Sequence, residues 1–129
     1  MNSRKRFILT AIYFVILVAA IIYAGNDSPK NLKAEVNETS VMLMWEAPVA
    51  SEVSVYHLYR AETGQMNESK EASQLDFNLL EKVTDTKYTD KKVKTNMKYV
   101  YYVVSVNNSG VESGGSNYVD VFTGEKTGK

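Results

Sequence analysis

The sequence contains no cysteine and a single histidine, His57. The absence of cysteine excludes a disulfide framework and thiolate chemistry. Without thiolates and with one imidazole, the ligands that zinc, copper and iron sites commonly use are almost exhausted. His57 is also the only side chain whose usual pKa suits a general base near neutral pH. It is expected to point outward from a strand. We therefore expect neither an enzyme nor a cofactor-binding protein.

Acidic residues are absent before Asp27, whereas Arg4, Lys5 and Arg6 lie near the start of the chain. Without those three cations, 12 basic side chains stand against 15 acidic ones, a net charge of −3. Because phosphate binding requires a basic surface, this balance argues against nucleic acid as a partner.

An apolar run from Phe7 to Ala24 is interrupted only by Thr10 and carries no charge. As a helix, eighteen residues rise about 27 Å, which is just enough to span a hydrocarbon core. The basic residues before the run place the N-terminus in the cytoplasm and the remainder of the chain outside. Residues 1–27 are therefore predicted to form a single-pass transmembrane anchor. The alternative is a signal peptide that is cleaved after Ala20 or Ala24, although neither site has the usual pair of small residues.

Residues 28–124 lack a sustained helical period and show short runs of alternating apolar residues between turns, which is typical of an all-β sandwich. The loop at 61–74 is the longest, and residues 125–129 form a tail. Seven strands in about 95 residues match the count of an immunoglobulin-like fold. The expected strands are 31–36, 40–45, 53–60, 77–83, 87–90, 98–108 and 117–123.

A set of ordered positions in this domain resembles the fibronectin type III family of the bacterial sort. These positions are Pro29, Leu32, Trp45, Pro48, Tyr56, Leu58, Tyr59, Arg60, the "YTD" at 88–90, Val93, Tyr99, "GVES" at 110–113, Ser116 and the "VDVFT" at 119–123. The resemblance implies seven strands in two sheets with Greek-key connections, an adhesive, spacer or scaffolding role, and no catalytic residues. The Arg-Gly-Asp tripeptide of some adhesive members is absent.

Three aromatic side chains are predicted to form the structural core. Trp45, the only tryptophan, and Tyr56 fall on inward positions of their strands. Tyr99 fits a tyrosine corner, in which a phenol near the start of the sixth strand bonds the backbone just upstream. We expect its partner within residues 93–95.

The sixth strand, "KYVYYVVSVNN", is apolar or aromatic on both faces. If Tyr99 and Tyr101 point inward, alternate residues must point outward, where a sandwich strand normally carries polar side chains. Such an exposed apolar face often marks an interaction site, although intrinsic strand propensity and cross-strand pairing would also explain it. The predicted partner-binding face consists of His57, Tyr59, Val100, Tyr102, Val104, Tyr118 and Phe122, with Val106 on the same side.

Two charged turns offer weaker signals. Asp85 and Asp90 lack the spacing of a calcium loop, so we expect ordinary turn residues. Lys91, Lys92 and Lys94, with Lys98, are expected to form a solvated turn, which we call the lysine turn; contact with acidic lipid or glycan is the alternative.

The sequence thus predicts a non-catalytic, membrane-anchored binding or scaffold protein that displays one domain outside the cytoplasmic membrane. Its expected partner is a protein of an envelope complex, docked on the predicted face. The alternative is a cleaved, secreted or periplasmic module that associates with polysaccharide through the same aromatic side chains.

Overall fold

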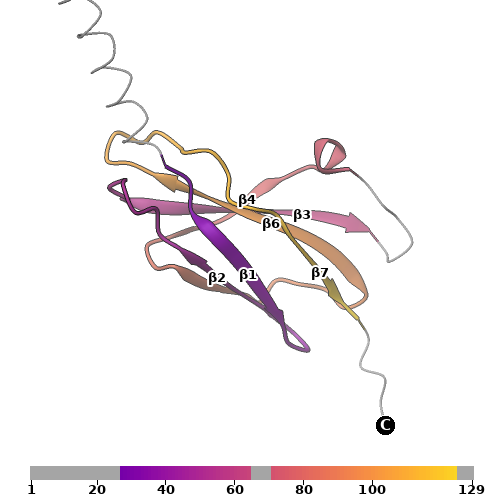
Figure 1. Cartoon of the computed structure of the whole chain (residues 1–129). Helices are drawn as coiled ribbons and strands as arrows, with labels where there is room; N and C mark the ends of the chain where they lie inside the picture. Colours follow the sequence, from indigo (N-terminus) through magenta and orange to yellow (C-terminus); the bar gives the residue numbers. More distant parts are fainter. Residues whose placement is uncertain (1–26, 65–70, 125–129) are drawn as a thin grey trace, which may run out of the picture.

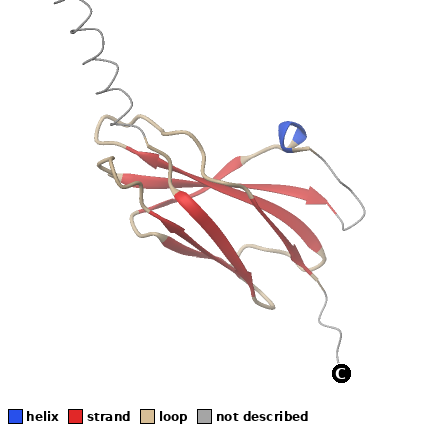
Figure 2. Ribbon diagram, viewed as in Figure 1, coloured by secondary structure: helices blue, strands red, loops and turns tan. Residues whose placement is uncertain are grey.

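The fold is known from a computed structural model that describes residues 27–64 and 71–124 (Figures 1 and 2). Its antiparallel strands form two sheets, ordered β1-β2-β5 and β4-β3-β6-β7. A single 3-10 turn, Ala72–Gln74, precedes β4. The strands are β1 (Lys30–Val36), β2 (Val41–Glu46), β3 (Val55–Gly64), β4 (Asn78–Val83), β5 (Lys87–Asp90), β6 (Met97–Val106) and β7 (Val119–Thr123). The predicted all-β fold of seven strands in two sheets is therefore confirmed.

Two other predictions concern the N-terminal helix and the longest loop. The helix expected at residues 7–24 lies outside the described residues, and residues 27–64 and 71–124 contain no helix long and apolar enough to cross a membrane. The loop expected from residue 61 was placed too early, because β3 continues to Gly64. Ala61 and Thr63 are buried on the continued strand, and Glu62 pairs with Tyr99 of β6. Tertiary pairing with a long central strand thus outweighs the polar composition of this segment.

The core lies between the two sheets and contains the alternate side chains of their inner faces. Trp45 of β2 and Tyr56 of β3 are buried and meet edge to face, with ring centroids 5.5 Å apart. Tyr99 and Tyr101 of β6 are fully buried in the same core. The indole nitrogen of Trp45 has no hydrogen-bond partner within the described part of the chain. Aromatic area therefore anchors this core, as is usual for a large ring packed between sheets.

On the side away from β3, the second half of β6 is paired with a loop and not with a strand, because β7 pairs only with Met97 to Tyr101. Beyond Tyr101, the connection from β6 to β7 runs beside β6 and bonds its backbone through two serine hydroxyls. Ser116 Oγ accepts from the Val103 N–H at 3.0 Å, and Ser113 Oγ accepts from the Ser105 N–H at 2.9 Å. The two serine N–H groups return bonds to the carbonyls of Val103 and Ser105. Side-chain oxygens thus replace strand carbonyls and satisfy a buried backbone.

The predicted tyrosine corner is present. The backbone N–H of Lys94 donates to Tyr99 Oη over 2.7 Å, within the segment 93–95 expected from the sequence. The Arg60 guanidinium carbon lies 5.0 Å from the centroid of the same ring. The phenol therefore fixes the turn before β6 while its ring packs under a cation.

The corner gives the first testable prediction. Replacing Tyr99→Phe removes the acceptor of the partly buried Lys94 N–H and should lower the free energy of unfolding by about 1–2 kcal/mol. Urea denaturation followed by the fluorescence of Trp45 measures the loss. The control, Tyr102→Phe, keeps its ring contacts and should cost less than half as much. Equal losses for the two variants would contradict the assigned roles.

Candidate functional site

Four aromatic rings gather on the outer face of the four-stranded sheet. Tyr59 of β3 and Tyr102 of β6 are opposite one another in register, and their rings stack with centroids 4.9 Å apart and planes 10° apart. Phe77, just before β4, and Tyr118, just before β7, meet Tyr102 edge-on at 4.9 and 5.5 Å. We call these residues, Tyr59, Phe77, Tyr102 and Tyr118, the aromatic cluster. Each stacked or edge-on ring pair of this kind stabilises the folded state by about 0.5–1.5 kcal/mol beyond the contribution of its buried area.

Exposure on this face differs from the expected one. Val100, Val104 and Val106 of β6 do lie on the outer side, yet they are buried, with exposed fractions of 8, 3 and 4%. The prediction that these valines are exposed was wrong. Their side chains are short, and they lie on a central strand beside larger neighbours such as His57 and Tyr102, which shield them.

The part of the face that reaches solvent is its aromatic rim. Tyr118 is 53% exposed, and Leu79 of the edge strand β4 is 44% exposed. Tyr59 and Tyr102 are partly exposed. Phe122 is partly exposed too, but it lies opposite Lys98 at the other end of β7 and makes no ring contact with the described aromatics. The predicted face is therefore split into a solvent-facing rim, a buried valine floor and an isolated Phe122.

The only histidine belongs to a small polar group beside the aromatic cluster. His57 Nδ1 lies 2.7 Å from Glu112 Oε1, and Tyr59 Oη donates to the same oxygen at 2.5 Å. These two hydrogen bonds lower the pKa of Glu112, whereas burial and the bond to Glu112 raise the pKa of Tyr59 to about 12. The group thus favours folding while Glu112 is ionised and Tyr59 is protonated. Its contribution is lost as the pH falls below the ordinary glutamate range, and again as the pH rises from 10 toward about 12.

Sequence reasoning did not include Phe77 or Glu112 in the site. The predicted strand 77–83 begins at Phe77, but β4 begins one residue later and the prediction gave the side chain of Phe77 no direction. Glu112 lies in the connection after β6, where it forms an isolated bridge with Val106. Only the register of the neighbouring strands brings them against Tyr102 and His57.

A buried charged network joins the two sheets at another place. Asp90 of β5 is fully buried, so the expectation of an ordinary turn residue was wrong. Its Oδ2 accepts from Arg60 Nη1 at 2.8 Å and from Tyr101 Oη at 2.7 Å, and its Oδ1 accepts from the Lys92 N–H at 3.0 Å. Burial acts to lower the pKa of Arg60, but the hydrogen bond and charge of Asp90 outweigh it and raise that pKa. Burial and the bond to Asp90 raise the pKa of Tyr101.

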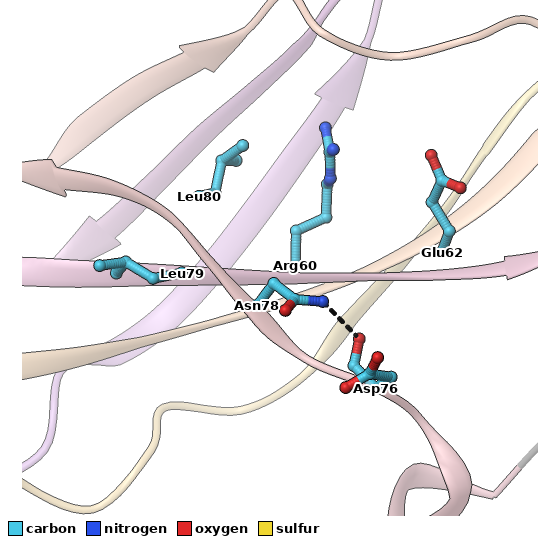
Figure 3. Close-up of a pocket in the computed structure, with 6 residues that line it drawn as sticks. All are labelled: Arg60, Glu62, Asp76, Asn78, Leu79 and Leu80. Atoms are coloured by element: carbon cyan, nitrogen blue, oxygen red, sulfur yellow. Dashed lines mark hydrogen bonds between the residues drawn. The ribbon is translucent and has the colours of Figure 1, made fainter.

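An open cleft of about 300 Å³ lies beside this network, next to the start of β4 (Figure 3). The side chains of Arg60, Glu62 and Leu80 extend to one side, whereas Asn78 donates to the backbone oxygen of Asp76 at 3.4 Å. The cleft contains no nucleophile paired with a base among its described lining residues. Within residues 27–64 and 71–124, no three His, Cys, Asp or Glu side chains are grouped to hold a metal ion.

The lysine turn lies at the end of the sandwich where β7 stops, with Lys91, Lys92 and Lys94 between β5 and β6, whereas Lys98 is on β6 itself and not in the expected turn. Met97 N–H donates to Thr123 Oγ1 at 3.2 Å, and that hydroxyl also bonds the carbonyl of Lys94. Lys94 is 71% exposed at its side chain, with Nζ 3.7 Å from Glu62 Oε1. Residue 27 is at the opposite end, beside the β2–β3 and β6–β7 connections (Figure 1). The turn is therefore remote from the point at which the domain begins.

Comparison with known proteins agrees with this architecture. A family model of the fibronectin type III domain matches residues 27–122. An Fn3-like protein from Clostridium thermocellum is 26% identical, with a TM-score of 0.58 over 81% of this chain and 99% of that one. The fibronectin type III domain of human fibronectin type III domain containing protein 3 is 23% identical, with a TM-score of 0.61 over 81% of this chain and 91% of that one.

A further similarity is to a domain within a larger enzyme. The β-1,2-glucanase from Parabacteroides distasonis matches with 20% identity and a TM-score of 0.61, over 80% of this chain but only 13% of the enzyme. At this identity the match shows the fold alone. A comparison with curated proteins finds no match.

The buried network gives the second prediction. Replacing Asp90→Ala leaves Arg60 and Tyr101 without their shared acceptor and should cost about 3–5 kcal/mol of folding free energy. Asp90→Asn keeps an acceptor and should cost less. The control is Asp120→Ala on the exposed surface of β7, which should change stability by less than about 0.5 kcal/mol. Chemical denaturation measures all three, and a loss for Asp90→Ala no larger than the control's would contradict the structural role.

Proposed function

The chain belongs to the fibronectin type III family, and we propose that it is a non-catalytic, membrane-anchored binding or scaffold protein. In this proposal residues 7–24 span the cytoplasmic membrane, and the domain is displayed on its outer side. The partner is a protein of the cell envelope, bound at the aromatic cluster. Domains of this family are typically binding or scaffold modules, which supports the general class of function.

The observation that carries the proposal is the aromatic cluster. Its most exposed member, Tyr118, leaves more than half of its surface in water, and Leu79 adds an exposed aliphatic side chain. Tyrosine and phenylalanine are enriched at protein interfaces, because a rigid ring buries much area at little entropic cost. The rings here are also held in place by one another, since Tyr102 contacts the other three members of the cluster. A preordered patch of this kind loses less entropy on binding.

The absence of catalytic chemistry in the described residues supports the same proposal. His57 is engaged with Glu112, and the buried carboxylate of Asp90 is fully used by Arg60, Tyr101 and the Lys92 N–H. Neither group is placed beside a nucleophile in a cleft. Both groups are instead held by their neighbours, and loss of one partner from the Arg60–Asp90 pair would leave an uncompensated buried charge.

The anchor rests on the sequence of the N-terminal segment. The run from Phe7 to Ala24 is uncharged and follows three cations, which is the pattern of a single span with its N-terminus in the cytoplasm. The cleaved alternative would release the same domain as a secreted or periplasmic module. In that case the exposed ring of Tyr118 would offer a surface on which a sugar ring can stack.

The third prediction tests the anchor. The full chain, expressed with its N-terminal segment, should remain in the membrane fraction after carbonate washing, and its mass should include residues 7–24. Protease added to the outside of intact spheroplasts should digest the domain. A mature N-terminus at Ile21 or Gly25 would replace the anchored form of the proposal with the secreted one.

The fourth prediction tests the aromatic cluster. The double variant Tyr118→Ser with Leu79→Ser should stop co-purification of the partner from solubilised membranes. It should lower the free energy of unfolding by at most about 1–2 kcal/mol, because the ring of Tyr118 stabilises the folded domain chiefly through its packing against neighbouring rings.

The matched control changes two exposed apolar residues of the other sheet. Val36 and Met44 are 43 and 36% exposed, and replacing both with serine should leave co-purification intact. Equal loss in both variants would assign the effect to general surface apolarity. Retained co-purification in the first variant would overturn the assignment of the binding site to the aromatic cluster. Retention of the wild-type chain on a polysaccharide affinity gel, lost in the first variant and without any co-purifying protein, would favour the glycan-associated alternative.

A further inference from the structure

The first described residue is fixed to the sandwich at both of its backbone polar groups. The Asp27 N–H donates to Ser51 Oγ over 2.8 Å, and the Asp27 carbonyl accepts from Ser105 Oγ over 2.8 Å. Ser51 belongs to the β2–β3 connection and Ser105 to β6, so the two bonds come from separate elements. Pro29 follows and is fully buried. The chain therefore joins the folded domain at residue 27 with no free linker after it.

The distance from this point to the apolar run is short. Only Gly25 and Asn26 separate Ala24 from Asp27. Even fully extended, three residue steps span no more than about 11 Å. If residues 7–24 cross a bilayer, which is the proposed anchor, the end of the domain at Asp27 must lie at the membrane surface.

Two loop tips lie at this same end of the sandwich, as Figures 1 and 2 show. They are the connection of β2 to β3 (47–54) and the connection of β6 to β7 (107–118), and the Ser54 N–H bonds the Val106 carbonyl where they meet. Each presents an unshielded valine. Val49 is 97% exposed and Val111 is 50% exposed, and Val49 is the most exposed large apolar side chain in the described residues.

The charges near these loop tips decide by which forces the tips could contact a membrane surface. Residues 47–54 and 107–118 contain no lysine or arginine, and their acidic residues are Glu52 and Glu112. Attraction to anionic lipid is therefore not available, and contact depends on apolar burial and small polar groups. The lysine turn, which does carry positive charge, lies at the far end beside Thr123.

We propose that the tips of the 47–54 and 107–118 connections, around Val49 and Val111, rest on the membrane interface and that these two valines insert among the lipid headgroups. The two hydrogen bonds at Asp27, which we call the clamp, hold them there and keep the domain upright. The lysine turn then faces away from the membrane, which excludes it as a lipid-binding site in the anchored chain.

The test uses the full chain in nanodiscs of phosphatidylcholine. Because the chain has no cysteine, single variants Val49→Cys and Val111→Cys can each carry one environment-sensitive fluorophore. We expect blue-shifted emission that is quenched by nitroxide-labelled lipid and protected from aqueous iodide. The matched control is Val36→Cys, an exposed valine at the end of β1 near Asp90, which should remain quenched by iodide and unaffected by the lipid quencher. High salt should leave all three results unchanged.

A linker variant tests whether the short tether between the apolar run and the clamp holds the loop tips at the membrane. Inserting about ten glycine and serine residues between Gly25 and Asn26 lets the domain move away from the surface without changing the apolar run. This variant should stay in the membrane fraction after carbonate washing while Val49→Cys and Val111→Cys lose most of their lipid quenching. Undiminished quenching in the linker variant would overturn the inference that the short tether to the clamp holds the loop tips at the membrane.

The outcomes separate this inference from the proposed anchor. A chain that remains in the membrane fraction but shows iodide quenching at positions 49 and 111 equal to that at 36 overturns the loop contact and leaves the anchor standing. A chain that leaves the membrane fraction after carbonate washing refutes the anchor, and the loop contact with it.

Discussion

The ion pair between Arg60 and Asp90 is the contact on which the packing of the two sheets depends. Arg60 belongs to the four-stranded sheet and Asp90 to the three-stranded one. Because a buried carboxylate without a partner costs several kcal/mol, the sheets can pack stably only where the guanidinium reaches Asp90. Tyr101 and the Lys92 N–H complete the acceptor's coordination. The fixed turn after β5 in turn holds the backbone that Tyr99 bonds, so the network extends from the core to the lysine turn.

Much of this fold could be predicted from alternation alone. Each of the seven strands expected from period-2 patterns is present, with ends displaced by no more than four residues. The tyrosine corner could also be predicted, because domains that resemble this one carry a tyrosine near the start of the sixth strand that bonds the backbone just upstream. The strands depend on local sequence and on one simple rule of side-chain direction, and the corner depends on the family resemblance. That is why a single sequence was sufficient for them.

The remainder required the register of strands far apart in the chain. Asp90 reads as a turn residue in sequence, and only pairing of β5 with β2 turns it toward Arg60. Val100 and Val104 alternate outward as expected, but their burial depends on the size of the side chains on the neighbouring strands. Phe77, the first residue of the expected strand 77–83, lies just before β4 and joins the aromatic cluster through its contact with Tyr102. Long-range geometry, which composition does not encode, therefore decided which part of the predicted face reaches solvent.

The domain has two chemically different ends. Which of them lies next to the anchor determines how the aromatic cluster is oriented relative to the membrane. One end holds the chain at Asp27 and has exposed valines at its loop tips, whereas the other carries the lysine turn beside Thr123. The aromatic cluster lies on the side between them, on the sheet that contains β6. In a chain anchored by residues 7–24, a clamp at residue 27 prevents the domain from tumbling about a linker. Its aromatic face would then point along the membrane plane, toward a partner held in the same membrane, and the entropic cost of orienting the two surfaces would be reduced before they meet.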